Sequence, residues 1–106
     1  MKMKKLILLL LLFSSSSFAN YSVDTGKIKS VFVNPNGAIA VTLTNGFPNA
    51  KKSDQCPNSN GWAGLGNSAN IFKSALLSAK ATQDNVKIVI EGCEGGWYRI
   101  KDVYIE

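Results

Sequence analysis

The turn at residues 34–37, with the alternation that follows it, constrains the fold of this chain most strongly. Residues 27–33 (KIKSVFV) are rich in β-branched and aromatic side chains, which is typical of a strand. The turn sequence Asn-Pro-Asn-Gly suits a tight reversal, because proline presets φ and glycine accepts a positive φ. In the next strand, residues 38–44, the large apolar side chains lie on one face: Ile39, Val41 and Leu43. The sequence therefore predicts a β-hairpin with one buried face.

The middle of the chain predicts a short strand and then one helix. Residues 45–67 are rich in Asn, Gly, Ser and Pro, and we expect a short strand near residues 52–56 and core contacts from Trp62 and Leu65. The following segment predicts an amphipathic helix that begins at a Ser68 cap and runs to about residue 80. Its expected core face is formed by Ile71, Phe72, Ala75, Leu76 and Ala79.

Two further strands complete the predicted fold, at residues 86–90 and 97–105, with a loop at residues 91–96 between them. The alternation slips near Lys101 and Asp102, which predicts a bulge that would let the apolar side chains of the last strand face the core. The predicted core is formed by Ile39, Val41, Leu43, Phe72, Leu76, Ile88 and Ile100.

This order of elements predicts a mainly β domain with one helix. Three strands, a helix and two strands (β-β-β-α-β-β) is the order of an OB-fold, a small five-stranded barrel. The alternative is an α+β sandwich with one helix on an antiparallel sheet. The whole of residues 20–106 would form this single domain.

The first nineteen residues have the layout of a secretory signal peptide. Three lysines precede an unbroken apolar run from Leu6 to Phe13, and Ser17-Phe18-Ala19 offers small residues for cleavage. A membrane anchor would need about 20 apolar residues, so we expect no membrane span. We expect cleavage after Ala19 and export to the periplasm or the outside of the cell.

The two cysteines, Cys56 and Cys93, both follow the predicted leader. In an exported small domain such a pair usually forms a disulfide, because the compartment is oxidising. The pair lacks the C-x-x-C spacing of a redox motif, so we expect a structural bond. Closing the loop between them would stabilise the fold by roughly 4 kcal/mol in the chain-entropy description.

The composition excludes several kinds of chemistry. The chain has no histidine, so it has no imidazole base and no histidine-ligated zinc site, and we expect no metal and no cofactor. The net charge of +5 includes three lysines of the leader, and the remaining cations are dispersed, which argues against nucleic acid as a partner. Glu91 and Glu94 could form a carboxylate pair, but a solvated loop is the favoured interpretation, so we expect no enzyme.

Aromatic residues give the better indication of a binding site. Trp97, Tyr98 and Tyr104 lie on the last predicted strand, beside the loop that contains Glu91. Sugar rings stack on flat aromatic faces while nearby polar groups bind their hydroxyls. The alternative is that these aromatic residues only pack in the core or cover the outside of the barrel. On the predicted helix, the candidates for a pore lining or a subunit contact are Asn70, Lys73, Ser74, Leu77 and Lys80.

The pattern resembles the B subunits of pertussis-like and subtilase-type bacterial toxins. The resemblance rests on Trp62, the helix ANIFKSALLSAK, the strand VKIVI and the aromatic-led strand WYRIKDVYI. It implies an OB-fold subunit in a pentameric ring, with the helix along the pore and sialylated glycans on the barrel. The position of the family's sialic-acid-binding serine corresponds to Lys29, with Ser30 adjacent, and Ile90 stands where the family has a tyrosine.

The sequence therefore predicts a secreted, non-enzymatic binding subunit. Its expected partner is a host glycan or glycoprotein, and it would assemble as a homo-oligomer, with a separate A subunit as a further partner. The candidate ligand-binding residues are Lys29, Ser30, Glu91, Trp97 and Tyr98. The alternative is an exported small protein-binding or inhibitory domain without sugar recognition.

Overall fold

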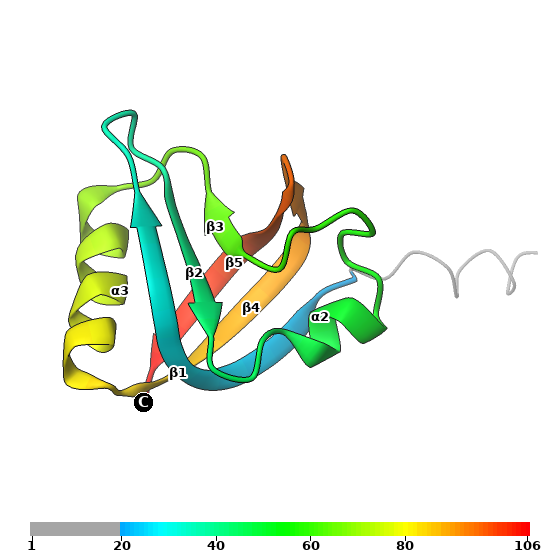
Figure 1. The fold of residues 1–106 in the computed structure, drawn as a ribbon, viewed down its shortest axis with the longest axis horizontal. Helices are drawn as coiled ribbons and strands as arrows, with labels where there is room; N and C mark the ends of the chain where they lie inside the picture. The colour runs from blue at the N-terminus through cyan, green and yellow to red at the C-terminus, as the bar shows by residue number, and fades with distance from the viewer. Residues whose placement is uncertain (1–19) are drawn as a thin grey trace, which may run out of the picture.

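The sheet of this protein closes on itself (Figure 1). The computed structural model describes residues 20–106, so the predicted signal peptide lies outside the described residues. The strands follow the hydrogen-bonded order β1-β2-β3-β5-β4, and β4 pairs again with β1. The pairs are antiparallel except β3 with β5, which is parallel. The strands are β1 (Ser22–Val33), β2 (Ile39–Leu43), β3 (Ala63–Leu65), β4 (Asn85–Glu94) and β5 (Trp97–Ile105).

Two helices lie at opposite ends of this sheet (Figure 1). The longer helix, α3 (Asn70–Thr82), connects β3 to β4, and the short helix α2 (Pro48–Lys52) lies between β2 and β3. Both helices pack against β1. The domain is therefore mainly β with one long helix, as predicted, with α2 as an additional turn of helix.

The first strand, β1, is long enough to pair with two different strands. Its first half, from Ser22 to Lys27, pairs with β4, and its second half, from Ile28 to Val33, pairs with β2. The register shifts between Ile28 and Ser30, so Lys29 is an extra residue in the ladder. An extra residue of this kind bends a strand and increases its twist, which lets β1 pass from one neighbour to the other.

Several predicted boundaries are wrong. Strand β1 begins at Ser22, whereas the sequence predicts a strand only from residue 27. No strand forms at residues 52–56, because α2 ends at Lys52 and the third strand is β3 instead. Strand β4 continues to Glu94, so the predicted loop at residues 91–96 is reduced to a turn at Gly95 and Gly96.

The predicted hairpin between β1 and β2 is confirmed. The amide of Gly37 donates to the carbonyl oxygen of Asn34 at 3.2 Å, and Gly37 has a φ of 97°. The Asn34 side-chain oxygen also accepts from the amides of Asn36 and Ala38, at 3.0 and 3.1 Å. These bonds explain why this short sequence turns tightly, since the asparagine side chain satisfies backbone donors inside the turn.

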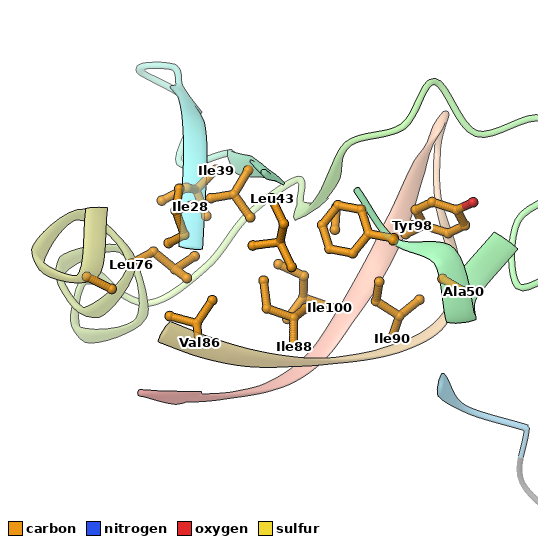
Figure 2. Close-up of a cluster of buried hydrophobic side chains, with 14 of the residues drawn as sticks. Ile28, Ile39, Leu43, Ala50, Leu76, Val86, Ile88, Ile90, Tyr98 and Ile100 are labelled. Carbon is orange, nitrogen blue, oxygen red and sulfur yellow. The ribbon is translucent and has the colours of Figure 1, made fainter. Parts of the chain in front are cut away.

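The core fills the inside of the closed sheet (Figure 2). The predicted core residues all belong to it, with Phe72 partly buried against it. Ile71 is the exception on the helix, because its side chain is 79% exposed and does not face the core. Ile105 is also 44% exposed, since β5 extends past the end of the core. The residues with the largest fully buried side chains are Ile28, Ile39, Leu76, Ile88, Ile90, Val41 and Val86.

The ends of α3 are held by residues that the sequence did not indicate. Ser68 does not cap the helix: its amide donates to the carbonyl of Gly37 at 3.2 Å, and the N-cap residue is Ala69. At the other end Gln83 adopts a left-handed conformation with φ of 58°. The ammonium of Lys27 donates to the Gln83 carbonyl at 2.7 Å, which places a cation at the negative end of the helix dipole.

The buried carboxylate of Asp24 holds α2 against β1. Its two oxygens accept hydrogen bonds from the amides of Asn49 and Ala50, at 2.9 and 3.1 Å. The side-chain amide of Asn49 donates in return to the carbonyl of Val23 at 2.8 Å. First-turn amides have no partner inside a helix, so a carboxylate 25 residues away in the sequence satisfies them here.

The predicted bulge in the last strand is confirmed. Val89 pairs with Asp102 and Ile90 pairs with Ile100, so Lys101 has no partner in the β4 ladder. The extra residue turns Ile100 into the core, where it is 3% exposed.

We predict that Leu76→Ala lowers the free energy of unfolding by about 2–5 kcal/mol, because Leu76 is fully buried and its removal leaves a cavity. Urea denaturation of the oxidised protein measures this change. Leu77→Ala is the matched control and should change stability by less than about 0.5 kcal/mol, since Leu77 is 45% exposed. Equal losses in the two variants would show that α3 does not pack as described.

We predict that Asp24→Asn destabilises the fold by about 1–3 kcal/mol, because the amide group of asparagine cannot accept from both buried backbone donors. Asp54→Asn is the control, since Asp54 is exposed and asparagine tolerates its positive φ of 58°. Thermal unfolding followed by circular dichroism compares the two. A loss at Asp54 as large as that at Asp24 would contradict the capping role.

Candidate functional site

The outside of the closed sheet carries a pair of aromatic rings. Phe32 near the end of β1 and Trp97 at the start of β5 contact each other, with ring centroids 5.8 Å apart and planes at 67°. Such an edge-to-face arrangement is favourable for two aromatic rings. Phe32 is 41% exposed and Trp97 is half-buried, so both rings are presented to solvent. We call the outer surface that carries these two rings the aromatic face; its other residues are Ser30, Ala40, Thr42, Gly64 and Arg99.

Small residues form the floor of the aromatic face. Phe32 pairs with Ala40 on β2, Ala40 pairs with Gly64 on β3, and Gly64 pairs with Arg99 on β5. These residues alternate with core residues, so the side chains of Phe32, Ala40 and Arg99 point outward, and Ala40 is completely buried there. The two middle positions of this row, Ala40 and Gly64, thus carry no bulky side chain, whereas Phe32 and Arg99 stand at its two ends.

Gly64 is required at its position by the close approach of β2. A Cβ atom there would lie 2.7 Å from Cα and Cβ of Ala40 and would also collide with the carbonyl oxygen of Ile39. Backbone atoms cannot yield to such a contact as a flexible side chain can. Gly64 therefore keeps β2 and β3 close together under the two rings.

Polar side chains border the aromatic face. Ser30 pairs with Thr42, and both lie on the outer side of the sheet, two residues along from Phe32 and Ala40. At the other end, the exposed Arg99 donates from Nε to the carbonyl oxygen of Glu91 at 3.4 Å. The outer side of the sheet thus carries the two rings, the hydroxyl groups of Ser30 and Thr42, and the guanidinium of Arg99 beside Glu91.

The β4–β5 turn that carries Trp97 is tied to the segment before β3. The amide of Asn60 donates to the Gly96 carbonyl at 3.0 Å, and the amide of Tyr98 donates to the Trp62 carbonyl at 2.9 Å. The carboxylate of Glu94 accepts from the amide of Gly66 at 2.9 Å. These bonds fix the position of Trp97, and they give Glu94 a structural role in place of the carboxylate pair considered from the sequence.

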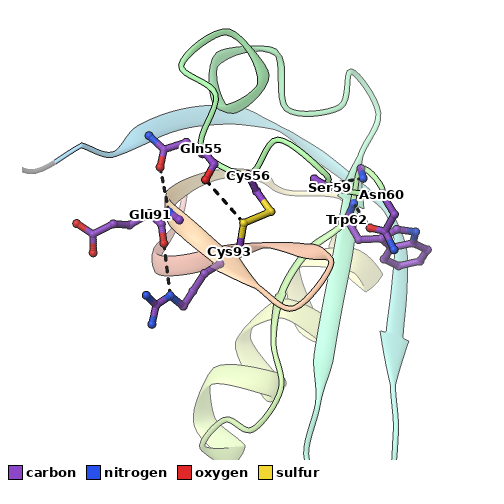
Figure 3. Close-up of a disulfide and its surroundings, with 10 residues drawn as sticks. Gln55, Cys56, Ser59, Asn60, Trp62, Glu91 and Cys93 are labelled. Carbon is purple, nitrogen blue, oxygen red and sulfur yellow. Dashed lines mark hydrogen bonds between the residues drawn. A yellow bond between two sulfur atoms is a disulfide. The ribbon is translucent and has the colours of Figure 1, made fainter.

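A disulfide joins the end of β4, just before this turn, to the loop after α2 (Figure 3). Cys56 and Cys93 are bonded, as predicted, with their Cα atoms 5.1 Å apart. Next to the disulfide, the buried side chain of Gln55 accepts from the Gly92 amide at 2.9 Å and donates to Asn20 at 3.3 Å. The loop after α2 is therefore fixed to β4 by a covalent bond and by hydrogen bonds.

The structure separates the predicted ligand-binding residues. Trp97 lies on the aromatic face, and Ser30 shares that face with Phe32. Tyr98 points inward instead, because neighbouring strand residues face opposite sides, and it is only 7% exposed. Its ring packs against Phe47 with centroids 5.8 Å apart, so Tyr98 and Trp97 lie on opposite sides of β5.

Glu91 lies beside Arg99, and Lys29 lies on the bulge of β1. Glu91 lines a small pocket of about 190 Å³ with Leu65, Arg99, Ile100 and Lys101, where β3 separates from β5. Lys101 in this pocket donates to Asp102 at 3.1 Å, and this hydrogen bond with the charge of Asp102 raises the pKa of Lys101 above its ordinary value. Lys29 is the exposed bulge residue of β1.

Three of the five candidate contact residues on α3 are exposed to solvent, and the other two are half-buried. Asn70, Ser74 and Leu77 are exposed, and Ile71 joins them. Lys73 and Lys80 are only half-buried, and the Lys73 ammonium turns back toward the hairpin, 3.7 Å from where a Cβ of Gly37 would lie.

Sequence reasoning missed Phe32, Thr42 and Arg99 as part of the site. Phe32 lies two residues after the named Ser30, so the alternation of β1 could have placed both on the outer face. Arg99 likewise follows Trp97 by two residues. The contact between the first and the last strand depends on the pairing of β1, β2, β3 and β5 across the sheet, and no local pattern indicates it.

No family model, curated protein or solved structure matches this chain. Among residues 20–106, no group of three or more His, Cys, Asp or Glu side chains could hold a metal ion. In that same part of the chain, no helix is long and apolar enough to cross a membrane.

We predict that Gly64→Ala lowers stability by about 1–3 kcal/mol, because the added methyl group must push β2 away from β3. Gly96→Ala is the control, since no atom lies within 4 Å of a Cβ at that position. Chemical denaturation of both variants measures the difference. A neutral Gly64→Ala would show that the floor of the aromatic face is not closely packed.

Proposed function

We propose that this protein is an exported, non-enzymatic binding subunit that binds a glycan on the aromatic face. The observation that carries the proposal is the contact between Phe32 and Trp97 over a floor of Ala40 and Gly64. Partly exposed rings on a rigid sheet offer flat apolar surface without the entropy cost of ordering a loop. Sugar rings bind to such surfaces through their C–H faces, while polar neighbours bind their hydroxyls.

The polar groups beside the rings suit a sugar. Ser30 and Thr42 supply hydroxyls, which both donate and accept hydrogen bonds, and Arg99 supplies several donors in a fixed plane. A guanidinium also pairs well with a carboxylate, so an acidic sugar would gain an additional interaction there. This arrangement differs from the sialic-acid site that the toxin resemblance implies, because Lys29 is not part of the aromatic face.

We also propose that the closed sheet is an OB-fold. The strand order, the parallel pair of β3 with β5 and the helix between β3 and β4 support this assignment. OB-folds bind oligosaccharides and oligonucleotides over their second and third strands, between the β1–β2 and β4–β5 loops. Phe32 precedes the first of these loops and Trp97 follows the second, which supports the aromatic face as the ligand site.

The proposed assembly is a homopentamer like the toxin B subunits. Two observations support self-association: Ile71 and Leu77 expose apolar surface on α3, at 79% and 45%. In addition, β3 pairs with β5 only at Tyr98 and Arg99, so the rest of that edge of β5 is open to another strand. A ring would also present several shallow sites at once, and this multivalency raises the affinity for a glycan-coated surface.

We predict that Trp97→Ala abolishes glycan binding while the fold is retained, because the variant removes the larger ring of the aromatic face. Glycan-array binding of the purified mature protein measures this. Tyr104→Ala is the matched control, since Tyr104 is a 55% exposed aromatic residue on the same strand away from Phe32. Retained binding in Trp97→Ala, or no array ligand for the unmodified protein, would contradict the proposal.

We predict that light scattering of the mature protein gives the mass of five subunits, and that Ile71→Ser shifts this mass toward the monomer. Because Ile71 is exposed within one subunit, the change should leave the unfolding of the subunit itself nearly unaffected. A monomer at micromolar concentration would contradict the ring. A monomer that also fails on the glycan array would favour an exported protein-binding or inhibitory domain.

A further inference from the structure

A second hollow of this protein lies beside the disulfide, away from the aromatic face. It has a volume of about 350 Å³, within the range of small-molecule sites. The side chains that line it include Lys51, Asp54, Ser59, Asn60 and Tyr98. None of these residues belongs to the aromatic face, and we call this hollow the disulfide pocket.

The wall of the disulfide pocket is rigid. Cys56 is itself one of its lining residues and is bonded to Cys93. The amide of Ser59 donates to the Cys56 carbonyl at 3.0 Å, and the amide of Gly61 donates to the Ser59 hydroxyl at 3.0 Å. The loop therefore holds its shape without a ligand, and a ligand would bind without first ordering it.

Tyr98 presents a hydroxyl from a fixed position. The side chain is 7% exposed and packs on Phe47, which fixes the ring. Figure 2 shows the hydroxyl oxygen pointing away from the other labelled side chains of the core. Tyr98 is also one of the residues that line the pocket, and a tyrosine hydroxyl can both donate and accept a hydrogen bond.

Lys51 and Asp54 bring opposite charges to the pocket without neutralising each other. Among residues 20–106, the two ion pairs join Lys87 to Glu106 and Lys101 to Asp102. Lys51 and Asp54 thus line one pocket with their charged groups more than 4.0 Å apart, the limit for an ion pair. Asp54 also has a φ of 58°, a conformation uncommon for a residue with a side chain.

This combination selects for a ligand that carries both charges. A simple anion is attracted by Lys51 and repelled by Asp54, and a simple cation has the opposite balance. A molecule with a carboxylate and an ammonium gains from both side chains, and its remaining polar atoms can bind Tyr98 and Asn60. We propose that the disulfide pocket binds a small zwitterion of the free α-amino-acid class, with its carboxylate on Lys51 and its ammonium on Asp54.

The experiment is a titration of the mature, oxidised protein with each common free α-amino acid in turn, followed by amide NMR shifts. The proposal predicts saturable shifts at Ser59, Asn60 and Gly61 below about 10 mM for at least one amino acid. The N-acetyl form of that amino acid lacks the ammonium, and its methyl ester lacks the carboxylate. Each should bind at least about tenfold more weakly, since each loses one of the two charge interactions.

Variants assign the interaction to the pocket. Lys51→Gln and Asp54→Asn should each weaken binding at least about tenfold, and Tyr98→Phe should weaken it without disturbing the core. Lys52→Gln is the matched control, because Lys52 is the neighbouring exposed lysine and does not line the pocket. Trp97→Ala should leave amino-acid binding unchanged, so this test is independent of glycan binding.

Three results would overturn the proposal. The first is the absence of saturable shifts at the pocket amides for every amino acid. The second is equal binding of the amino acid and its N-acetyl or methyl-ester form, which would show that the two charges are not recognised together. The third is an equal effect of Lys51→Gln and Lys52→Gln, which would show that a general surface charge is responsible.

Discussion

The pairing of β1 with two different strands is the constraint on which the rest of the structure depends. The first half of β1 completes the sheet at β4 and the second half begins the hairpin with β2, with the bulge at Lys29 between them. Closure gives the sheet one enclosed side, which the core fills, and one outer side. The hairpin half of β1, paired through β2 and β3 to β5, brings Phe32 on the first strand into contact with Trp97 on the last, although 65 positions separate them in the sequence.

Because side chains alternate along β5, neighbouring aromatic residues of this strand belong to two different surfaces. Trp97 points outward to the aromatic face, and Tyr98, the next residue, points inward and lines the disulfide pocket. The same turn supports both, because it is fixed to the segment before β3 by backbone hydrogen bonds and to the loop after α2 by the disulfide at Cys93. A proposed glycan site and a proposed amino-acid site can therefore coexist without sharing a side chain.

The sequence was sufficient wherever a local pattern decides the structure. The hairpin at residues 34–37, the alternation of β2 and the bulge at Lys101 follow from turn chemistry and from the two-residue period of a strand. The sequence was insufficient wherever a residue far away along the chain decides the local structure. Strand β1 begins early because β4 pairs with polar residues there, and Asp24 holds α2 across 25 positions. A helical projection could not show that Ile71 extends past the core. The aromatic face was half predicted, since Trp97 and Ser30 were named and Phe32 was not.

The central claim is that the outer rings of the closed sheet form the ligand-binding surface, and the fluorescence of Trp97 tests it most directly. The chain has two tryptophans, so Trp62→Phe leaves Trp97 as the only fluorophore of its kind. With a glycan bound on the aromatic face, the account predicts a blue shift of the Trp97 emission and a loss of quenching by acrylamide, both saturating with glycan concentration. A bound glycan that leaves the emission and the quenching of Trp97 unchanged would contradict the account.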